Sequence, residues 1–303
     1  MPWSLAVHGG AGSLPRDLSA ARREECLAGL RQALAAGSGV LAKNGGSLDA
    51  VQAAVVVLED HPFFNAGRGA GFNRAGQHEL HASIMAGDLR AGAAAGLGRV
   101  KNPVILARRV LEKTAHILLA GPGAEAFAAA EGLELVDNSW FSTEARRAEW
   151  RQLAGSSTSL LDVPPAGSEP GGTVGAVALD SAGHLAAATS TGGLINQLPG
   201  RIPDSALPGA GTYADQRTCA VSCTGVGEYF IRAAAAHEVH ALMLHKGLSL
   251  EAAARAVIFE TLPAAAGGLI ALDTRGHHAF SFSTLSMARG CANASGTCDI
   301  ALW

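Results

Sequence analysis

The chain has 303 residues, of which 48% are hydrophobic and 16% charged, with a formal net charge of -3. These values are typical of a globular protein with a substantial core. They exclude the excess of positive charge with which a protein binds the phosphate backbone of nucleic acid. No apolar stretch reaches the roughly 18 residues of a membrane helix, and the start MPWSLAVHGGAG lacks the basic region of a secretory signal, which predicts a cytoplasmic protein.

The first part of the chain predicts a mixture of strands and helices. Residues 4–12, SLAVHGGAG, are typical of a buried strand that runs into a glycine turn, and a helix with leucines at helical spacing follows. Ser47 is expected to cap a second helix, after which residues 61–71, HPFFNAGRGAG, form a glycine-punctuated loop. Strands are then predicted near 77–85 and 91–98, and helices near 104–113 and 123–130.

A polar stretch from about residue 136 to residue 172 contains the run VPPAGSEPGG and predicts a flexible linker. Two apolar strands are expected directly after it, TVGAVALD and HLAAATS, joined by a short turn. The remaining pattern predicts a strand at 220–223, helices at 230–245 and 249–259, and strands at 267–273 and 279–283.

A flexible linker that ends in Gly-Gly before a strand beginning with Thr173 meets the needs of a self-cleaving N-terminal nucleophile. Cleavage between Gly172 and Thr173 would free an α-amine, whose pKa is about 7.7 to 8.0, beside the threonine hydroxyl. One residue would then supply both the nucleophile and its base. Taken alone, the same residues are explained more simply as a glycine turn at the start of a strand.

Five motifs in order resemble those of the plant-type asparaginases and isoaspartyl peptidases, a family of N-terminal nucleophile (Ntn) hydrolases. They are HGGAG, FNAGRGA, GGTVGAVALD, the stretch TSTGGLINQLPGRIPDSALPGAGTYAD with AVSCTGVGE, and GGLIALD. The resemblance covers nearly the whole chain. It implies an α+β fold, the four-layer αββα sandwich, and self-cleavage into residues 1–172 and 173–303, which together form one structural domain. It also implies a dimer of such heterodimers.

The resemblance assigns catalytic roles to four residues. Thr173 is the nucleophile, and the hydroxyl of Thr191 orients it. The hydroxyl of Thr224 and the backbone N–H of Gly225 form the oxyanion hole, where donors meet the charge that develops on the attacked carbonyl. Outside this motif set the same residues would be two ordinary strand threonines and a tight turn.

Three further residues are implied to bind the substrate. Arg201 grips the α-carboxylate in bidentate fashion, while Asp204 and the carbonyl of Gly227 receive the α-ammonium. Out of context, Arg201 and Asp204 would be a surface ion pair. Opposite charges three residues apart on a glycine-flanked loop also suit a zwitterionic amino acid.

Supporting roles follow from the same resemblance. The HGGAG turn, with Gly9, lies near the active site and aids self-cleavage, and Asn65 reaches toward the nucleophile. No organic cofactor is implied, but the loop after the second helix resembles one that wraps a sodium ion with backbone carbonyls. By position these carbonyls belong to Leu58, Glu59, His61, Phe64, Ala66 and Arg68.

The chain departs from the family pattern at several positions. Where the family usually reads DASIMDG this chain has HASIMAG, so that His81 and Ala86 replace two carboxylates. Pro203 replaces a glycine between Arg201 and Asp204, and Ala206 replaces a proline. These changes bear on substrate preference more than on the type of reaction.

The resemblance implies hydrolysis of the side-chain amide of L-asparagine and of β-aspartyl dipeptides through a Thr173-linked acyl intermediate. The alternatives are a glycosylasparaginase-like or taspase-like Ntn hydrolase, a catalytically idle homologue that binds an amino acid, and a nonenzymatic glycine-rich scaffold. The GG of STGGLINQ favours asparaginases over glycosylasparaginases, and the absence of a long insertion disfavours a taspase.

Overall fold

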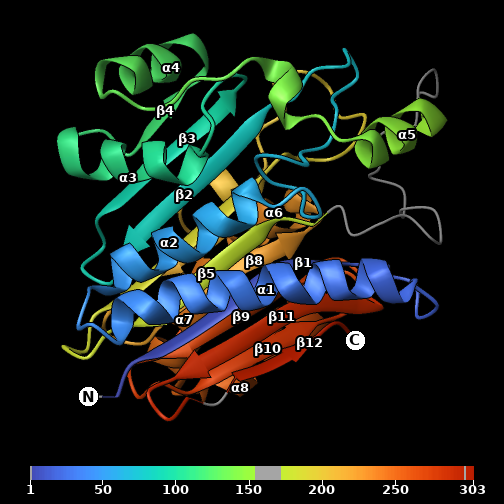
Figure 1. Cartoon of the computed structure of the whole chain (residues 1–303). Coiled ribbons are helices and arrows are strands. Elements are labelled where there is room, and N and C mark those ends of the chain that lie inside the picture. The colour runs from blue at the N-terminus through green and yellow to red at the C-terminus, as the bar shows by residue number, and fades with distance from the viewer. Residues whose placement is uncertain (1, 154–171, 297) are drawn as a thin grey trace.

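The computed structural model describes residues 2–153, 172–296 and 298–303 and contains two β-sheets flanked by helices (Figure 1). The large sheet has eight strands, antiparallel except for the last pair. In spatial order they are β12 (Cys298–Ala301), β11 (Ser286–Asn293), β1 (Ser4–Gly12), β5 (Val174–Leu179), β6 (Leu185–Thr191), β2 (Leu80–Ala86), β3 (Ala91–Leu97) and β4 (Leu118–Ala120).

The small sheet has four antiparallel strands in the order β10 (His278–Phe282), β9 (Gly267–Asp273), β8 (Cys219–Gly225) and β7 (Thr212–Ala214). The helices that precede Thr173 are α1 (Ala20–Leu41), α2 (Ser47–Asp60), α3 (Pro103–Lys113), α4 (Gly121–Ala130), the 3-10 helix η1 (Asn138–Phe141) and α5 (Glu144–Leu153). Those that follow it are η2 (Asp204–Ala206), α6 (Gly227–Ala233), α7 (Ala235–Lys246), α8 (Leu250–Ala256) and the π-helical turn η3 (Val257–Thr261).

Strand β5 shows how the core is divided. Its alternate residues Val174, Ala176 and Ala178 belong to an apolar cluster shared with α1 and α2, which lie side by side across the large sheet (Figure 1). Val177 and Leu179 belong to a second cluster, shared with β8 and β9 of the small sheet. Both faces of β5 are therefore buried, and residues of odd number face the small sheet.

The outer face of the small sheet packs against helices. Cys219, Val221 and Cys223 of β8 form a third apolar cluster with residues such as Val239 of α7 and Ala253 of α8. The thiols of Cys219 and Cys223 are buried and form no disulfide, because residues four apart in a strand lie roughly 13 Å apart, too far for an S–S bond. The expected mixture of helix and sheet is confirmed.

Several boundaries differ from the sequence-based expectation. Ser47 is the first helical residue of α2, whose N-cap is Gly46, and its backbone N–H donates to Oδ2 of Asp180 at 3.1 Å. The single helix expected over 230–245 is broken at Ala234, whose φ of 46° is left-handed. Strands β4, β7, β11 and β12 were not predicted.

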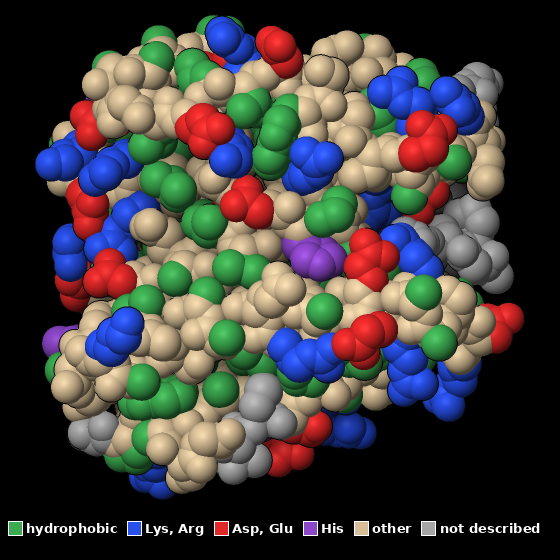
Figure 2. Space-filling model, in the orientation of Figure 1, with side chains coloured by type: hydrophobic (Ala, Val, Ile, Leu, Met, Phe, Trp, Pro, Cys, Tyr) green, Lys and Arg blue, Asp and Glu red, His purple; other side chains and the backbone are tan. Residues whose placement is uncertain are grey.

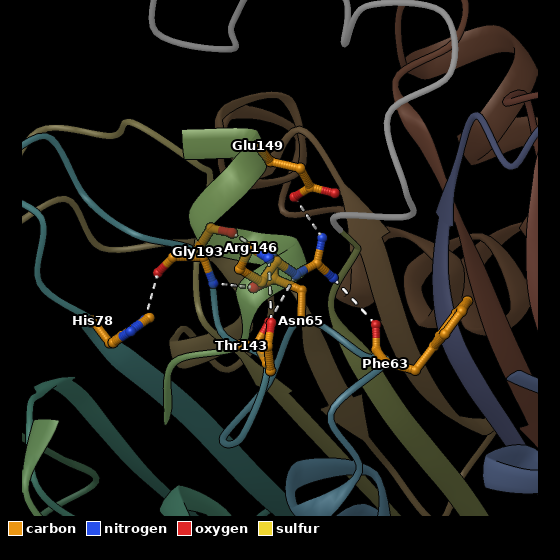
Figure 3. Close-up of polar contacts among 9 residues, drawn as sticks. Phe63, Asn65, His78, Thr143, Arg146, Glu149 and Gly193 are labelled. Atoms are coloured by element: carbon orange, nitrogen blue, oxygen red, sulfur yellow. Dashed lines mark hydrogen bonds and ion pairs between the residues drawn. The ribbon is translucent and has the colours of Figure 1, made fainter. Parts of the chain in front are cut away.

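The predicted linker is wrong in its first part, because η1 and α5 occupy residues 138–141 and 144–153. Arg146 of α5 is buried, and its guanidinium donates to the carbonyls of Gly69 at 2.9 Å and Phe63 at 3.3 Å (Figure 3). It also pairs with Glu149 at 2.9 Å. These bonds fix α5 against the glycine-punctuated loop. The rest of the predicted linker, 154–171, lies outside the described residues.

The surface carries charges of both signs. Figure 2 shows acidic and basic side chains interspersed over one face, without a large area of a single sign. None of the helices in the described part of the chain combines the length and the apolar character needed to cross a bilayer.

Two glycines in α1 test the packing of the helices on the sheet. A Cβ atom on Gly37 would lie 2.7 Å from Cδ2 of Leu5 and 3.0 Å from the carbonyl oxygen of Ala50, whereas one on Gly39 would meet nothing within 4 Å. We expect Gly37→Ala to lower the free energy of unfolding by about 1–3 kcal/mol through overpacking. Gly39→Ala, the matched control, should raise it by about 0.5–1 kcal/mol because alanine loses less backbone entropy.

Urea unfolding in a Thr173→Ala background, which removes the expected self-cleavage, measures both changes. Equal effects of the two substitutions would contradict the close packing of Gly37.

Candidate active site

Thr173 lies directly before β5 and is buried, with 5% of its surface exposed. Its hydroxyl Oγ1 is 3.3 Å from Oγ of Ser205, which follows Asp204 in η2. While the chain is continuous the nitrogen of Thr173 is an amide and not a base. The geometry thus presents a held hydroxyl whose base would appear only on cleavage.

The HGGAG turn lies against the expected cleavage point. A Cβ atom on Gly172 would come within 2.6 Å of Cα of Gly10 and 2.8 Å of the backbone nitrogen of Ala11. Gly10 itself has a φ of 112°, a conformation that favours glycine. Gly9 instead packs against the Phe64 ring, where a Cβ atom would lie 2.4 Å from a ring carbon. Within this motif, Gly10 is therefore the residue that adjoins Gly172.

Thr191 is brought beside Thr173 by strand pairing. Val174 pairs with Ser190 in the antiparallel register of β5 and β6, which places Thr191 next to Thr173. The Oγ1 atom of Thr191 accepts the backbone N–H of Gly193 at 3.1 Å. Because this bond uses the Thr191 oxygen as an acceptor, the hydroxyl hydrogen points away from Gly193 and can be donated to another group.

Thr224 lies near the end of β8, opposite the HGGAG turn. Its Oγ1 accepts the backbone N–H of Ala11 at 3.0 Å, and its hydroxyl hydrogen is therefore available to a ligand. A Cβ atom on the following Gly225 would lie 2.2 Å from the carbonyl oxygen of Ala266 and 2.7 Å from Cα of Gly267. Only glycine fits this approach of β8 to β9.

Arg201 forms an ion pair that the sequence analysis missed. Its Nε and Nη2 atoms each donate to a carboxylate oxygen of Glu228 at 2.9 Å, while Nη1 is 3.4 Å from Oε1 of Gln197. Burial raises the pKa of Glu228, but hydrogen bonds and charge from Arg201 oppose it and leave the pKa below its ordinary value. Nothing in the local sequence indicates that a residue 27 positions away completes this fork.

Asp204 is buried and lies close to the same guanidinium. A Cβ atom on Gly227 would be 2.6 Å from Oδ1 of Asp204 and 2.9 Å from Nη2 of Arg201, which places all three residues together as expected. Burial raises the pKa of Asp204 to about 7, against the opposing charge of Arg201. Its Oδ2 has no hydrogen-bond partner among the described residues.

Asn65 joins the glycine-punctuated loop to the turn after β6. Its Nδ2 donates to the carbonyl of Gly193 at 2.7 Å, and its Oδ1 accepts the N–H of Gly71 at 2.8 Å (Figure 3). Gly193 also donates its backbone N–H to the Thr191 hydroxyl, which is expected to orient the nucleophile. Asn65 is therefore linked to Thr191 through Gly193.

A buried chain of hydroxyl groups runs between the two sheets to Ser205. Burial lowers the pKa of His8, at its start, to about 3, so the ring is neutral. In the sequence, the Thr-Ser-Thr end of β6 is the one local pattern that indicates this chain of contacts. The links are His8 Nε2 to Ser222 Oγ (2.8 Å), Ser222 Oγ to Thr189 Oγ1 (2.8 Å), Thr189 to Thr212 (2.5 Å), Thr212 to Ser83 Oγ (2.8 Å) and Ser83 Oγ to the Ser205 carbonyl (2.6 Å).

The positions that depart from the family pattern are unequally distant from the site. His81 pairs with Thr191 across β2 and β6, whereas Ala86 pairs with Ala186 at the other end of these strands, about 17 Å away. Pro203 precedes η2 with a φ of -80°, which its ring permits. His81 is therefore the departure in β2 that adjoins the site.

Comparison with known sequences decides the family. The sequence model of the family described as Asparaginase matches residues 1–302. The chain belongs to the asparaginase family. It is 46% identical over 300 residues to an isoaspartyl peptidase of Escherichia coli strain K12, an alignment that covers 97% of this chain and 94% of that protein. It is 42% identical over 323 residues to a probable isoaspartyl peptidase/L-asparaginase 2 of Arabidopsis thaliana, covering 99% of each.

The buried carboxyl of Asp204 makes the stability of this asparaginase-family chain depend on pH. Its folded pKa of about 7 lies above the ordinary value of 3.8, so the folded chain retains a proton that the unfolded chain releases. The stabilisation that the folded chain gains by holding this proton is complete below about pH 4. It is lost as the pH rises toward 7. Asn cannot ionise, so we expect the stability of Asp204→Asn relative to its parent to increase by on the order of 2 kcal/mol from pH 5 to pH 8.

Urea unfolding at both pH values in the Thr173→Ala background measures this difference, and the exposed Asp137→Asn serves as the matched control. If the free energies of unfolding of Asp204→Asn and its parent differed by the same amount at pH 5 and pH 8, the folded chain would already hold Asp204 ionised at pH 5.

Proposed function

We propose that this chain cuts itself before Thr173 and then hydrolyses the side-chain amide of L-asparagine and the isopeptide bond of β-aspartyl dipeptides. Relatives that match nearly its full length are named isoaspartyl peptidases and L-asparaginases, and the chain is accordingly a hydrolase. The observation that carries the mechanism is the buried Thr173 hydroxyl, which lies 3.3 Å from Ser205 Oγ, next to Thr191 and directly after the Gly172 that packs on Gly10.

Self-cleavage would follow from attack of the Thr173 hydroxyl on the carbonyl carbon of Gly172. The approach of Gly172 to Gly10 leaves no room for a side chain at either position and holds the scissile peptide against the turn. Attack forms an ester between the two residues as the Gly172–Thr173 amide bond breaks, and water then releases the carboxylate of Gly172. The product has Thr173 at its N-terminus, with a free amine.

In the catalytic cycle the α-amine of Thr173 takes the proton of its own hydroxyl as the oxygen attacks the substrate side-chain carbonyl. The hydroxyl of Thr224 and the N–H of Gly225 would stabilise the oxyanion. The bond from Ala11 to Thr224 supports this role, because it occupies the oxygen and leaves the hydrogen to donate. The ammonium then protonates the leaving amine, and water hydrolyses the acyl-Thr173 ester.

Substrate recognition would use the opposite charges that meet at Gly227. The Nε–Nη2 edge of Arg201 is taken by Glu228, so an α-carboxylate would meet Nη1 and the remaining hydrogen of Nη2. Asp204 would bind the α-ammonium, and the carbonyl of Gly227 would assist it. A bound cation favours the ionised carboxylate and offsets the cost of burying it.

The resemblance also supports a finer account of the fold and assembly. We propose that the two sheets and their helices form the four-layer αββα sandwich of Ntn hydrolases, with residues 1–172 and 173–303 as one structural domain. Two such pairs would form a dimer of heterodimers, and its location would be cytoplasmic.

We also propose a structural sodium ion at the C-terminal end of α2. Two of the expected carbonyls already accept backbone N–H groups: that of Glu59 from Arg68 at 2.7 Å and that of His61 from Phe64 at 3.3 Å. Each carbonyl oxygen retains a lone pair for a hard cation. The ion would fix the loop and take part in no chemical step.

The role of Thr173 is tested by intact mass and N-terminal sequencing after incubation. Wild type should yield fragments 1–172 and 173–303, with the second beginning at Thr173. Thr173→Val, of similar shape but without the hydroxyl, should stay whole and inactive, whereas Thr173→Ser should cleave and turn over slowly. A wild-type chain that stays whole would overturn the mechanism and favour an idle amino-acid-binding homologue.

The oxyanion role of Thr224 predicts a specific kinetic change. Thr224→Val keeps the shape and removes the donor, so kcat for a β-aspartyl dipeptide should fall by about 100- to 1000-fold. KM should change by less than threefold because the charge develops only in the transition state. The comparison needs fully cleaved enzyme of both types. A fall in kcat of less than threefold would exclude Thr224 as an oxyanion donor.

A further inference from the structure

Three buried polar atoms without hydrogen-bond partners among the described residues belong to side chains near Arg201. They are Nε2 of His81, Nε2 of Gln197 and Oδ2 of Asp204. A buried polar atom that stays unpaired destabilises the fold, so such a cluster calls for a ligand that would satisfy it. Two of these atoms belong to side chains with no role in the mechanism above.

Gln197 holds its amide oxygen beside the guanidinium of Arg201, which leaves its amide nitrogen unpaired. Its Oε1 accepts the backbone N–H of Leu194 at 2.9 Å and lies 3.4 Å from Nη1 of Arg201, which settles the orientation of the amide. A Cβ atom on Gly193 would be 2.8 Å from Nε2 of Gln197. The free NH₂ group therefore lies against the turn that directly follows Thr191.

His81 approaches the same region from β2. It pairs with Thr191 in the antiparallel register of β2 and β6, so the two side chains lie on one face. Ser83, two residues further along this face, reaches the carbonyl of Ser205, which identifies the face as the one that holds the site. His81 is therefore in the row of side chains that contains Thr191 and Thr173.

The protonation of His81 is fixed by its surroundings. The backbone N–H of Gly96 donates to Nδ1 at 3.1 Å, so in the neutral ring Nε2 carries the hydrogen. Burial, with a smaller contribution from the charge of Arg201, lowers the pKa of His81 to about 3 and keeps the ring neutral. His81 thus offers one N–H donor with a defined direction.

We propose that Gln197 and His81 are specificity residues, an inference that rests on the proposed function. Each would donate its Nε2 hydrogen to the α-carboxylate of the substrate, beside Nη1 of Arg201. A carboxylate has about four lone-pair sites, enough for Gln197, His81, Nη1 and the remaining hydrogen of Nη2. An α-carboxamide would present an NH₂ group to at least one of them and leave donors unpaired. The site therefore selects substrates whose aspartyl residue has a free α-carboxylate.

Isosteric variants separate the donor from the ring. His81→Asn keeps an acceptor for the N–H of Gly96 but lacks the distal donor, whereas His81→Gln carries an amide N–H near the position of Nε2. For a β-aspartyl dipeptide we expect His81→Asn and Gln197→Met to raise KM at least tenfold, with kcat within threefold of wild type. His81→Gln should keep KM within threefold. The exposed Gln32→Met, on α1, is the control.

A second readout distinguishes recognition from structure. Wild type and variants that have cleaved themselves to the same extent are assayed with the dipeptide and with its α-carboxamide derivative, and their kcat/KM values are compared. The preference for the carboxylate should fall at least tenfold in His81→Asn and Gln197→Met, whereas a merely structural loss would affect both substrates equally. An unchanged KM and preference would overturn the inference while leaving the function intact.

Binding of L-aspartate, followed by calorimetry, tests the inference even without turnover. If wild type hydrolyses no β-aspartyl substrate but binds L-aspartate at least tenfold more tightly than His81→Asn and Gln197→Met do, the proposed function fails and the subsite stands. If wild type binds no L-aspartate, the subsite falls as well.

Discussion

The antiparallel register of β5 with β1 and β6 is the constraint on which the site depends. Side chains alternate between the two faces of a strand, so a slip of one residue would exchange every residue that faces the helices with one that faces the small sheet. The apolar residues Val174, Ala176 and Ala178 hold β5 against the helices and thereby turn Thr173 toward the other sheet. Ordinary hydrophobic packing on one face thus positions a polar group on the other.

The layer between the sheets has an apolar part and a polar part. Val177 and Leu179 meet Ile270 and Leu272 in the apolar part, while hydroxyl groups from both sheets bond to one another in the polar part. Each link satisfies a buried group, which makes the polar part rigid at little cost. Gln197 and Asp204, which lie near Arg201, each retain a buried polar atom without a partner among the described residues, and we propose that the substrate binds there.

The sequence predicted the elements with strong local patterns and missed those without them. The apolar run after Thr173 predicted β5 and β6, but β4 and β7 have three residues each and no such pattern. The break between α6 and α7 falls on an alanine in a left-handed conformation, a residue that ordinarily favours helix continuation. Arg201 and Asp204 could be proposed from their motif, whereas Glu228 could not, because tertiary structure alone brings it to Arg201.

The strand order of the large sheet has a consequence for a chain cut before Thr173. β1 and β2 precede the cut, whereas β11, β5 and β6 follow it, and the spatial order alternates between the two pieces at three junctions. The pieces would therefore be interlocked by backbone hydrogen bonds rather than docked across a surface, and separating them would expose a strand edge on each side of every junction. Such edges aggregate readily. A mature two-chain form would then owe its persistence to slow unfolding, and heat would inactivate it irreversibly.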